Sequence, residues 1–421
     1  MAGTEDIIVV GGGVVGLACA LALVETGRSV RVLERDRVGC GSSHGNCGTL
    51  TPSHAAPLAA PGTVRKALRW MLTPDAPFYL KPRIDPGLWR WLLRFAARCN
   101  REQWLATMRH KGALLQVSRE LFPRWIARHG LDCEFVESGF DYVFRSQAAF
   151  DHLAATLDPL RALGIASETI VGGDYLREEP AVREGVIGAI RFPGDASLRP
   201  DRYVAELARV ARARGVRIDE GLAVERIVVQ REGVVVATPG GEFTGRDVVL
   251  AAGAWTPLLA RSAGLHTLPL TPAVLQPGKG YSITYDPVAA PPKRPLVLYE
   301  RSVCVTAWAS GFRLGSTMEF SGYDTRLNRR RLDALERGAA EYLHTPVGPL
   351  KREEWFGWRP LTFDDLPMIG RVPGHRHVWI AAGHGMMGVG MSTGTAQLLS
   401  EMIDGRDTSF DATPYRPGRF L

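Results

Sequence analysis

The chain has 421 residues, of which 45% are hydrophobic and 23% are charged, and its net charge is +7. This composition is typical of a globular protein of two or three domains, and it excludes a disordered chain, a collagen-like repeat and a disulfide scaffold. The positive charge is concentrated in residues 65–128, which hold 14 Lys or Arg against 4 Asp or Glu. No nucleic-acid-binding module accompanies this segment, so we do not expect a nucleic-acid partner.

The cysteines and the uncharged runs narrow the class further. Six cysteines, at 19, 40, 47, 99, 133 and 304, lack the paired spacing of a zinc or iron–sulfur site, so we expect a reducing compartment and no metal. The uncharged runs at 7–24 and 378–400 are interrupted by glycines, which fits neither a signal peptide nor a spanning helix. We therefore expect a soluble or peripheral protein.

The first predicted elements form a nucleotide-binding unit. Residues 7–10 are Ile and Val, typical of a buried parallel strand, and they lead into Gly-Gly-Gly-Val-Val-Gly at 11–16, a G-x-G-x-x-G match. A helix from 14 to about 26 and a strand at 30–33 follow, and Glu34 ends that strand.

Each residue of this unit has its own physical role. Gly11 makes the turn, Gly13 lets the backbone approach a pyrophosphate, and Gly16 lets the helix pack on the strand. The phosphates lie at the positive end of the helix, and Glu34 accepts hydrogen bonds from ribose hydroxyls. An acid at this place disfavours the phosphorylated ribose of NADP and leaves NAD and FAD.

A second glycine loop near the carboxyl end favours FAD. A strand at 378–382 precedes Gly383, Gly385 and Gly388, which repeat the G-x-G-x-x-G spacing, and a helix is predicted at 392–403. Only 33 residues follow Gly388 and no acid-terminated strand is among them, so this is not a second dinucleotide unit. Its backbone N–H groups suit the electron-rich edge of a flavin ring. With a third apolar strand at 248–253, the pattern predicts one long ligand, FAD.

Several motifs occur in a fixed order along the chain: 11–16, Glu34-Arg35, Ser42-Ser43, Asn46, Gly48, Pro52, Lys279-Gly280-Tyr281-Ser282, Gly357-Trp358-Arg359-Pro360 and Gly383-His384-Gly385. This order resembles, nearly from end to end, that of the FAD-dependent D-amino acid dehydrogenases of the D-amino acid oxidase/glycine oxidase superfamily. Residues 59–71 are similar to the bacterial dehydrogenase branch in particular.

The resemblance implies an α/β fold with a Rossmann-like FAD-binding domain and a discontinuous antiparallel-sheet substrate domain. The implied boundaries are 1–75, 195–265 and 350–421 for the first domain and 76–194 and 266–349 for the second. Strand-like stretches at 133–144, 186–192, 280–285 and 296–306 agree with the second domain. A helix at 203–214 and a strand at 216–218 read as a further element of the first domain.

The resemblance also implies which residues contact FAD. They are Gly11, Gly13, Val14, Val15, Gly16, Glu34, Arg35, Ser42, Ser43, Asn46, Gly48, Leu50, Val224, Ala252, Gly253, Trp255, Gly383, Gly385, Met386, Met387 and Gly388. Relatives that oxidise dimethylglycine attach FAD to a histidine of this loop, but His44 lies one residue further from Gly48 than in that pattern. Sarcosine-oxidase relatives use a cysteine near Gly357-Trp358, and none is present. We therefore predict noncovalent FAD.

The expected reaction is oxidation of a D-amino acid. Arg359 matches the carboxylate-binding arginine of the family, and a guanidinium holds a carboxylate through two parallel hydrogen bonds. The neutral amino acid then gives a hydride from Cα to flavin N5, and the imine hydrolyses to a 2-oxo acid and ammonia without a protein base. Tyr281, His54 and His384 are further candidates near the site, each with plain packing as the alternative.

The basic segment predicts a surface for a membrane. Arg90, Arg94 and Arg98 recur every four residues and so share a helix face, with Trp89, Leu92, Leu93 and Ala96 largely opposite. Together with Arg65, Lys66, Arg69 and Trp70 they favour contact with anionic lipid, and a solvated basic face is the alternative. The resemblance favours contact, because the dehydrogenase branch passes electrons to a respiratory acceptor, usually a membrane quinone. It implies a cytoplasmic protein at the inner face of the cytoplasmic membrane.

Other functions remain open at this level. A cyclic imino acid dehydrogenase acting on D-proline or cis-4-hydroxy-D-proline would use the same clamp, with Met386, Met387 and Met391 shaping the pocket or merely packing. An oxidase would return the electrons to oxygen, and an FAD-bound assembly protein would lack Arg359. A nicotinamide dehydrogenase would need a second complete nucleotide unit.

Overall fold

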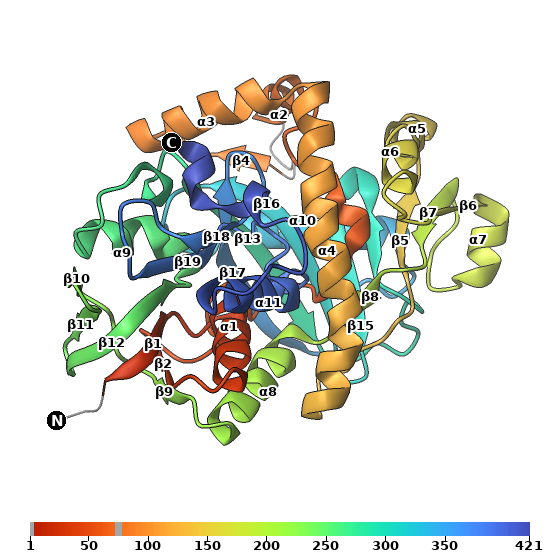
Figure 1. The fold of residues 1–421 in the computed structure, drawn as a ribbon. Helices are drawn as coiled ribbons and strands as arrows, with labels where there is room; N and C mark the ends of the chain where they lie inside the picture. Colours follow the sequence, from red (N-terminus) through yellow and green to blue (C-terminus); the bar gives the residue numbers. More distant parts are fainter. Residues whose placement is uncertain (1–3, 72–77) are drawn as a thin grey trace.

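The computed structural model describes residues 4–71 and 78–421 and contains two large sheets with helices around them (Figure 1). The strands are β1 Glu5–Val10, β2 Val30–Leu33, β3 Thr49–Leu50, β4 Phe78–Leu80, β5 Phe140–Phe144, β6 Glu168–Val171, β7 Gly188–Phe192, β8 Ala196–Ser197, β9 Arg217–Asp219, β10 Arg226–Val229, β11 Val234–Thr238, β12 Gly241–Leu250, β13 Leu275–Tyr285, β14 Leu296–Leu298, β15 Val303–Trp308, β16 Gly311–Phe320, β17 Lys351–Thr362, β18 Met368–Arg371 and β19 Val378–Ala382. The helices are α1 Val14–Glu25, α2 Thr63–Met71, α3 Pro86–Arg98, α4 Arg101–His129, α5 Gln147–Ala154, α6 Leu157–Arg161, α7 Gly172–Glu178, α8 Pro200–Ala213, α9 Thr256–Ser262, α10 Arg329–Tyr342 and α11 Ser392–Ile403. Short 3₁₀ turns include η1 Pro52–Ala55.

The first sheet is the predicted nucleotide-binding unit. Its parallel strands run in the order β9, β2, β1, β12 and β19, with β1 in the middle. The chain therefore winds outward from β1 in one direction and then in the other, which is the topology of a dinucleotide-binding fold. Strands β10, β11 and β18 extend this sheet in antiparallel fashion. The predicted helix and strand after residue 200 are confirmed as α8 and β9.

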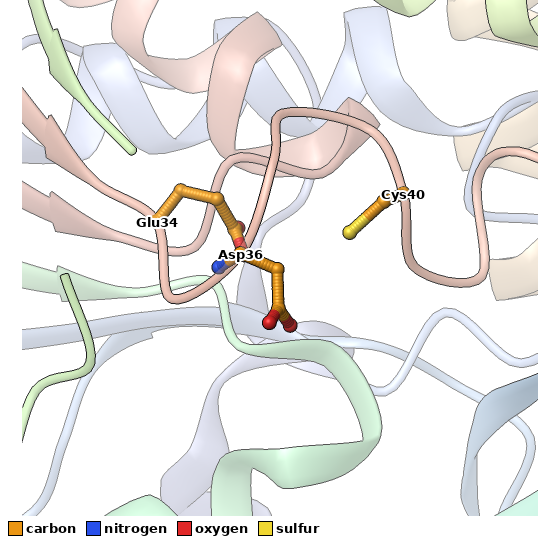
Figure 2. A group of neighbouring side chains, drawn as sticks. All are labelled: Glu34, Asp36 and Cys40. Carbon is orange, nitrogen blue, oxygen red and sulfur yellow. The ribbon is translucent and has the colours of Figure 1, made fainter. Parts of the chain in front are cut away.

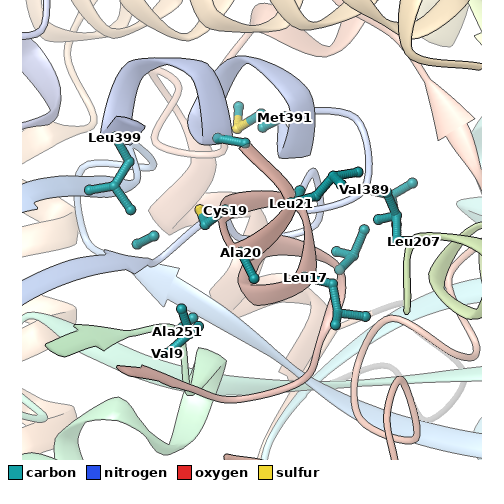
Figure 3. Packing of buried hydrophobic residues seen from close by; sticks show 14 of the residues in the cluster. Val9, Leu17, Cys19, Ala20, Leu21, Leu207, Ala251, Val389, Met391 and Leu399 are labelled. Carbon is teal, nitrogen blue, oxygen red and sulfur yellow. The ribbon is translucent and has the colours of Figure 1, made fainter. Parts of the chain in front are cut away.

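Burial on both faces explains why β1 is apolar throughout. Ile7 and Val9 pack against helices α1, α8 and α11, whereas Ile8 and Val10 face a second cluster that includes β10 and β11. Figure 3 shows the helical side, where side chains of α8 and α11 lie around α1, and Val9 and Ala251 of the sheet lie beneath it. A strand buried on both faces needs apolar residues at successive positions, and this is the pattern the sequence carries.

The second sheet runs in the order β17, β13, β16, β15, β14, β5, β7 and β6. Helix α10 covers one face of it with Leu332, Leu335 and Ala339. Strand β17 pairs with β13 from Leu275↔Thr362 to Tyr285↔Lys351, so residues 351–362 belong to this sheet. Residues 351–362, which the prediction assigns to the FAD-binding domain, therefore lie in the second sheet.

Helix α4 joins the two parts of the molecule. The Asn100 side chain accepts from the backbone N–H of Gln103 at 3.0 Å and caps its start, and Gly130, with φ of 57°, ends it. Leu114, Leu115 and Phe122 of this helix are buried in the same cluster as α1 and α11. A helix inside the predicted substrate segment 76–194 thus packs into the helical core beside the first sheet.

Candidate active site

A cavity of about 1600 Å³ extends from the carboxyl ends of β1, β2 and β12 to the inner faces of β13, β15 and β17. Parallel sheets of this topology bind ligands at the carboxyl ends of their strands. The volume exceeds the 300–1,000 Å³ or so that a single drug-sized ligand occupies, so it has room for a dinucleotide and a substrate.

Glycines shape the nucleotide end of the cavity. Gly11 has φ of +114°, and a Cβ there would lie 2.6 Å from the carbonyl oxygen of Ala251 at the end of β12. A Cβ on Gly16 would overlap the carbonyl oxygen of Gly11. Helix α1 starts at the cavity wall with no acidic residue in its first turn. The Val14 N–H donates to the neutral hydroxyl of Ser43 at 3.1 Å, so no negative charge offsets the positive end of the helix and it attracts an anion. This end therefore fits a pyrophosphate.

Glu34 is held in place by the backbone around it. Its carboxylate accepts from the N–H groups of Gly12 at 2.6 Å and Asp36 at 2.9 Å. Figure 2 shows Glu34 and Asp36 with Cys40 nearby, and their three potential ligand atoms lie within 4.8 Å of one another. Because the Glu34 carboxylate already serves two N–H groups and the other two residues are exposed, the group fits the ribose end of a dinucleotide site.

Most of the predicted FAD contacts line this one cavity. They are Gly11, Gly13, Val14, Val15, Glu34, Arg35, Ser42, Ser43, Asn46, Val224, Ala252, Gly253, Trp255, Gly385, Met386, Met387 and Gly388. The other four stand behind the wall: Gly16 packs α1 on the strand, Leu50 is in the core, and Gly48 and Gly383 make turns with φ of 72° and 85°. The residues present therefore fit FAD in one extended site.

The structure also gives the positions of His44 and Met391, for which the sequence left alternative roles open. The His44 imidazole Nε2 lies 2.9 Å from Glu353 Oε1, and His44 is not among the residues that line the cavity. Met391 is buried in the helical core of Figure 3, whereas Met386 and Met387 line the cavity. Met391 is therefore a packing residue.

At the other end of the cavity Arg359 extends from β17 across Gly280 of β13. A Cβ on Gly280 would lie 2.6 Å from Arg359 Nη1, so only glycine leaves room for the guanidinium. Arg359 donates to the carbonyl oxygens of Ser316 and Thr317. Burial lowers the pKa of Arg359 to about 10, so it stays charged at neutral pH. Within the described part of the chain it has no carboxylate partner, which leaves its charge available to an anionic ligand.

A bulge in β16 aims these carbonyl groups at Arg359. The register between β13 and β16 shifts opposite Gly280, and there Ser316 and Thr317 have φ of 133° and 61°. Non-glycine residues rarely adopt positive φ, and such strain collects at functional sites. Sequence reasoning missed both residues, because nothing in the strand-like sequence around them signals a bulge.

The two predicted histidines are both neutral. Burial lowers the pKa of His54 to about 3, with Lys111 adding to the effect, and burial alone lowers the pKa of His384 to about 3. His384 Nε2 lies 3.0 Å from Thr395 Oγ1, and His54 Nε2 lies 3.0 Å from Tyr142 Oη. Neither can supply a positive charge to substrate at neutral pH.

Tyr281 borders the cavity, but its hydroxyl is engaged elsewhere. It donates to Glu319 Oε2 at 3.1 Å, and burial together with Glu319 raises its pKa. The geometry favours the packing alternative for its side chain.

Sequence reasoning also missed a buried acid and an aromatic wall. Asp195 accepts from Ser53 Oγ at 2.5 Å, and burial raises its pKa to about 7. Phe140, Tyr142 and Tyr299 line the cavity beside His54. These residues come from segments far apart in the chain and share no local motif, so no sequence signal could have grouped them.

Helices α2 and α3 of the basic segment lie at one edge of the molecule (Figure 1), and their exposed side chains are both apolar and basic. Arg94 and Arg98 turn inward, their guanidinium groups 5.5 and 5.8 Å from the Phe363 ring, so the predicted basic outer face of α3 is wrong at these positions. The exposed apolar side chains are Ile84 (99% exposed), Trp89 (53%), Leu93 (72%) and, on α2, Leu68 (60%). In the described ranges no helix is both long and apolar enough to cross a membrane.

Helix α2 connects this surface to the cavity. Thr63, Lys66 and Trp70 line the cavity, whereas Val64 and Leu68 are exposed on the outside. One short helix therefore has one face on the cavity and an apolar face toward the exterior.

Comparison with known proteins identifies relatives over nearly the full length. A family model described as FAD dependent oxidoreductase (DAO) matches residues 6–402. A D-amino acid dehydrogenase of Granulibacter bethesdensis is 31% identical over 96% of this chain and 97% of that protein. Another, of Cereibacter sphaeroides, is 34% identical over 99% of this chain and 95% of that protein.

Solved structures share the fold at lower identity. A glycine oxidase of Geobacillus kaustophilus superposes with a TM-score of 0.79 at 23% identity, covering 99% of both chains. An L-proline dehydrogenase of P. horikoshii superposes with a TM-score of 0.72 at 20% identity, covering 100% of this chain and 98% of the other. These likenesses confirm the predicted two-sheet fold.

Proposed function

The chain belongs to the DAO family of FAD-dependent oxidoreductases, and from this we propose that it is a D-amino acid dehydrogenase that converts D-amino acids to 2-oxo acids and ammonia. The observation that carries the proposal is Arg359, a buried and charged guanidinium at the cavity wall whose only described partners are backbone carbonyls and the Met318 sulfur. A buried cation without an anion is costly unless a ligand supplies one. The carboxylate of an amino acid meets this need.

The residues of this chain position the substrate rather than move its proton. Arg359 holds the carboxylate in one orientation, and the aromatic wall excludes water from the α-carbon. The glycine-lined half would hold FAD noncovalently, and the bound flavin would supply the hydride acceptor. The buried positive charge of Arg359 disfavours a second positive charge near it, and this favours the neutral amine that hydride transfer requires. His54 and His384 are neutral, so neither adds to this effect.

The substrate side chain meets an apolar wall. Phe140, Tyr142, Val297 and Tyr299 surround this part of the cavity. We expect apolar D-amino acids to react better than charged ones, because these four side chains offer a buried charge no ion-pair partner. The same wall accommodates a ring amine, which keeps D-proline and cis-4-hydroxy-D-proline as the second candidate substrates.

The electron acceptor is proposed to be a membrane quinone. The support is α2, which borders the cavity and exposes apolar side chains on its outer face, next to the exposed Trp89 and Leu93 of α3. Such an arrangement rests at the surface of a bilayer, and Arg65 and Lys66 on the same helix suit anionic headgroups. The protein would then work at the inner face of the cytoplasmic membrane.

Anaerobic absorbance spectroscopy tests this function. We expect the flavin bands of the purified holoenzyme to bleach on addition of apolar D-amino acids or D-proline, and not of their L-enantiomers. Reoxidation by a soluble quinone should be faster than by oxygen, and acid precipitation should release the flavin. A flavin that no amino or imino acid bleaches would contradict the proposal.

Arg359→Lys tests the clamp directly. Lysine keeps the charge but loses the paired hydrogen bonds, so kcat/KM should fall by about 100-fold while flavin content is unchanged. Arg177→Ala is the matched control, because Arg177 lies on exposed α7 in an ion pair with Asp174. Unaltered kinetics of Arg359→Lys would remove Arg359 from substrate binding.

A further inference from the structure

Two thiols lie in the wall of the substrate end of the cavity. Cys47 follows the glycine-rich loop, Cys304 is on β15, and both line the cavity together with Arg359. Both are free thiols and both are only partly covered. Neither has a role in the reaction proposed above.

The strands around them bring the two sulfur atoms together. Thr306 Oγ1 donates to the carbonyl oxygen of Cys47 at 2.9 Å, and Cys304 lies on the same face of β15, two residues away. Gly315 of β16 pairs directly with Cys304, and a Cβ on Gly315 would lie 2.5 Å from Cys47 Sγ. The Cys47 sulfur thus occupies the space above this pair, next to Cys304.

The two thiols differ in acidity. The hydrogen bond from Cys304 lowers the pKa of Cys47, and the charges of Arg313 and Arg359 lower it further. The same hydrogen bond, together with burial and the Cys47 charge, raises the pKa of Cys304. One thiol suited to attack beside a second thiol suited to resolve is the arrangement of an oxidation-sensitive pair.

We propose that Cys47 and Cys304 form a peroxide-sensitive dithiol that closes into a disulfide in the substrate end of the cavity. Hydrogen peroxide is the oxidant. The Cys47 thiolate attacks one peroxide oxygen, the O–O bond breaks, and the leaving hydroxide takes a proton to become water. Cys304 then attacks the resulting sulfenic sulfur, its proton leaves with the displaced hydroxide as a second water, and the S–S bond forms. Two thiols and one peroxide give one disulfide and two waters.

Closure would act on the carboxylate clamp. Cys47 and Cys304 are the two groups whose charges raise the pKa of Arg359 against the effect of its burial. A disulfide removes both ionisable thiols next to the guanidinium and fixes the Cys47 loop against β15. This consequence rests on the proposed function, whereas formation of the disulfide does not.

The test uses the FAD-loaded protein, with and without hydrogen peroxide. Denatured protein should show six reactive thiols before treatment and four after it. Intact mass should fall by about 2 Da, as expected for one disulfide, and peptide mapping should join the peptides of Cys47 and Cys304. A dithiol reductant should restore both readouts. No change in thiol count, or a disulfide between other cysteines, would overturn the proposal.

Single substitutions separate the two roles. Cys304→Ser should convert the reaction to stepwise oxygen addition at Cys47 that the reductant does not reverse, and Cys47→Ser should slow thiol loss by about tenfold or more. Cys99→Ser is the matched control, since Cys99 ends α3 outside the cavity, and it should still form the disulfide. Peroxide sensitivity of the same size in Cys47→Ser would overturn the assignment.

Turnover is measured separately on the same samples. If D-amino acids are substrates, oxidation should raise KM by about tenfold or more, with reversal by the reductant. If no substrate is found, the mass and the thiol count still decide the disulfide. A disulfide that forms without any change in KM would overturn its proposed effect on Arg359.

Discussion

The two ends of the cavity are built in different ways. The nucleotide end consists of backbone and glycines from the turns after β1 and β12, and its charge comes from the start of α1 and from Glu34. The substrate end consists mainly of side chains from η1, β5 and β17, and two of them, His54 and Arg359, are buried with shifted pKa values. The nucleotide end recognises its ligand by shape, whereas the substrate end recognises its ligand by buried charge and aromatic contact.

The difference predicts different failures. At the nucleotide end, adding one methyl group meets backbone that cannot move, so the fold and the cofactor should be lost together. At the substrate end, the neighbours of a new methyl group are side-chain tips that can shift, so the fold should survive while substrate binding weakens.

Gly16→Ala should have the largest effect. Its Cβ would overlap the carbonyl oxygen of Gly11, which is fixed by the turn between β1 and α1. We expect a loss of about 3 kcal/mol in the free energy of unfolding and loss of most bound flavin. Denaturant unfolding and the flavin-to-protein absorbance ratio measure the two. Gly194→Ala, where nothing lies within 4 Å of the added Cβ, should change neither; a flavin-replete Gly16→Ala would contradict this view of the turn.

Gly280→Ala tests the other end with the same added methyl group. Its Cβ would lie 2.6 Å from Arg359 Nη1. The guanidinium can move away, but it then loses its orientation toward the substrate carboxylate. We expect kcat/KM for a D-amino acid to fall by about 30-fold, or about 2 kcal/mol, mostly through KM, with full flavin content. If Gly280→Ala lost as much flavin as Gly16→Ala, the expectation that the two ends fail in different ways would be wrong.

The same contrast explains what could be predicted from the sequence. Gly11, Gly13, Gly16 and Glu34 lie within one short segment, because a strand, a turn and a helix bind the dinucleotide locally. Their spacing therefore indicates the site, and the structure brings them to the cavity or directly behind it. The helix at 392–403 was predicted from the glycine loop before it, and its bounds are confirmed.

At the substrate end, the sequence predicted only those residues that lie in a recognisable motif. Arg359 lies in the Gly-Trp-Arg-Pro motif, but its partners Ser316 and Thr317 owe their role to a bulge in β16. The orientation of Arg94 was missed for a related reason. Helical spacing shows that arginines share a face, but only the position of Phe363 decides that the face turns inward.

Asp195→Asn tests whether the pH dependence of stability arises behind the substrate end, where Asp195 accepts from Ser53 next to His54. Burial raises the pKa of Asp195 from 3.8 to about 7, so the folded state keeps a proton that the unfolded state loses. Asp195 therefore lowers the free energy of unfolding as pH rises from about 4 to 7, by about 1.4 kcal/mol per pH unit at most. His54 and His384, with pKa lowered from 6.5 to about 3, act in the opposite direction below pH 6.5.

Without the Asp195 carboxyl, the opposing contribution of the histidines to the pH dependence of the free energy of unfolding should remain. The free energy of unfolding of Asp195→Asn should then rise more steeply than that of the unmodified protein between pH 4.5 and about 6.5, as measured by urea unfolding. Asp158→Asn, at an exposed acid of α6, is the control. Parallel pH curves for Asp195→Asn and the unmodified protein would show that Asp195 is ionised in the fold.

The smallest expected effect concerns the exterior of the substrate end, where α2 and α3 expose apolar side chains. Trp89→Glu combined with Leu93→Glu should lower the partition coefficient onto anionic vesicles by about tenfold, because both side chains are mostly exposed and can enter the interface without refolding. Val171→Glu, at a residue 63% exposed on β6, introduces a charge away from these helices and should not change sedimentation. Salt separates the two sources of binding: apolar insertion persists when ionic strength is raised, whereas attraction by Arg65 and Lys66 weakens. Binding that salt abolishes and that the double variant leaves intact would assign the surface to charge, as the sequence alone suggested, and would remove the apolar face from the proposed contact.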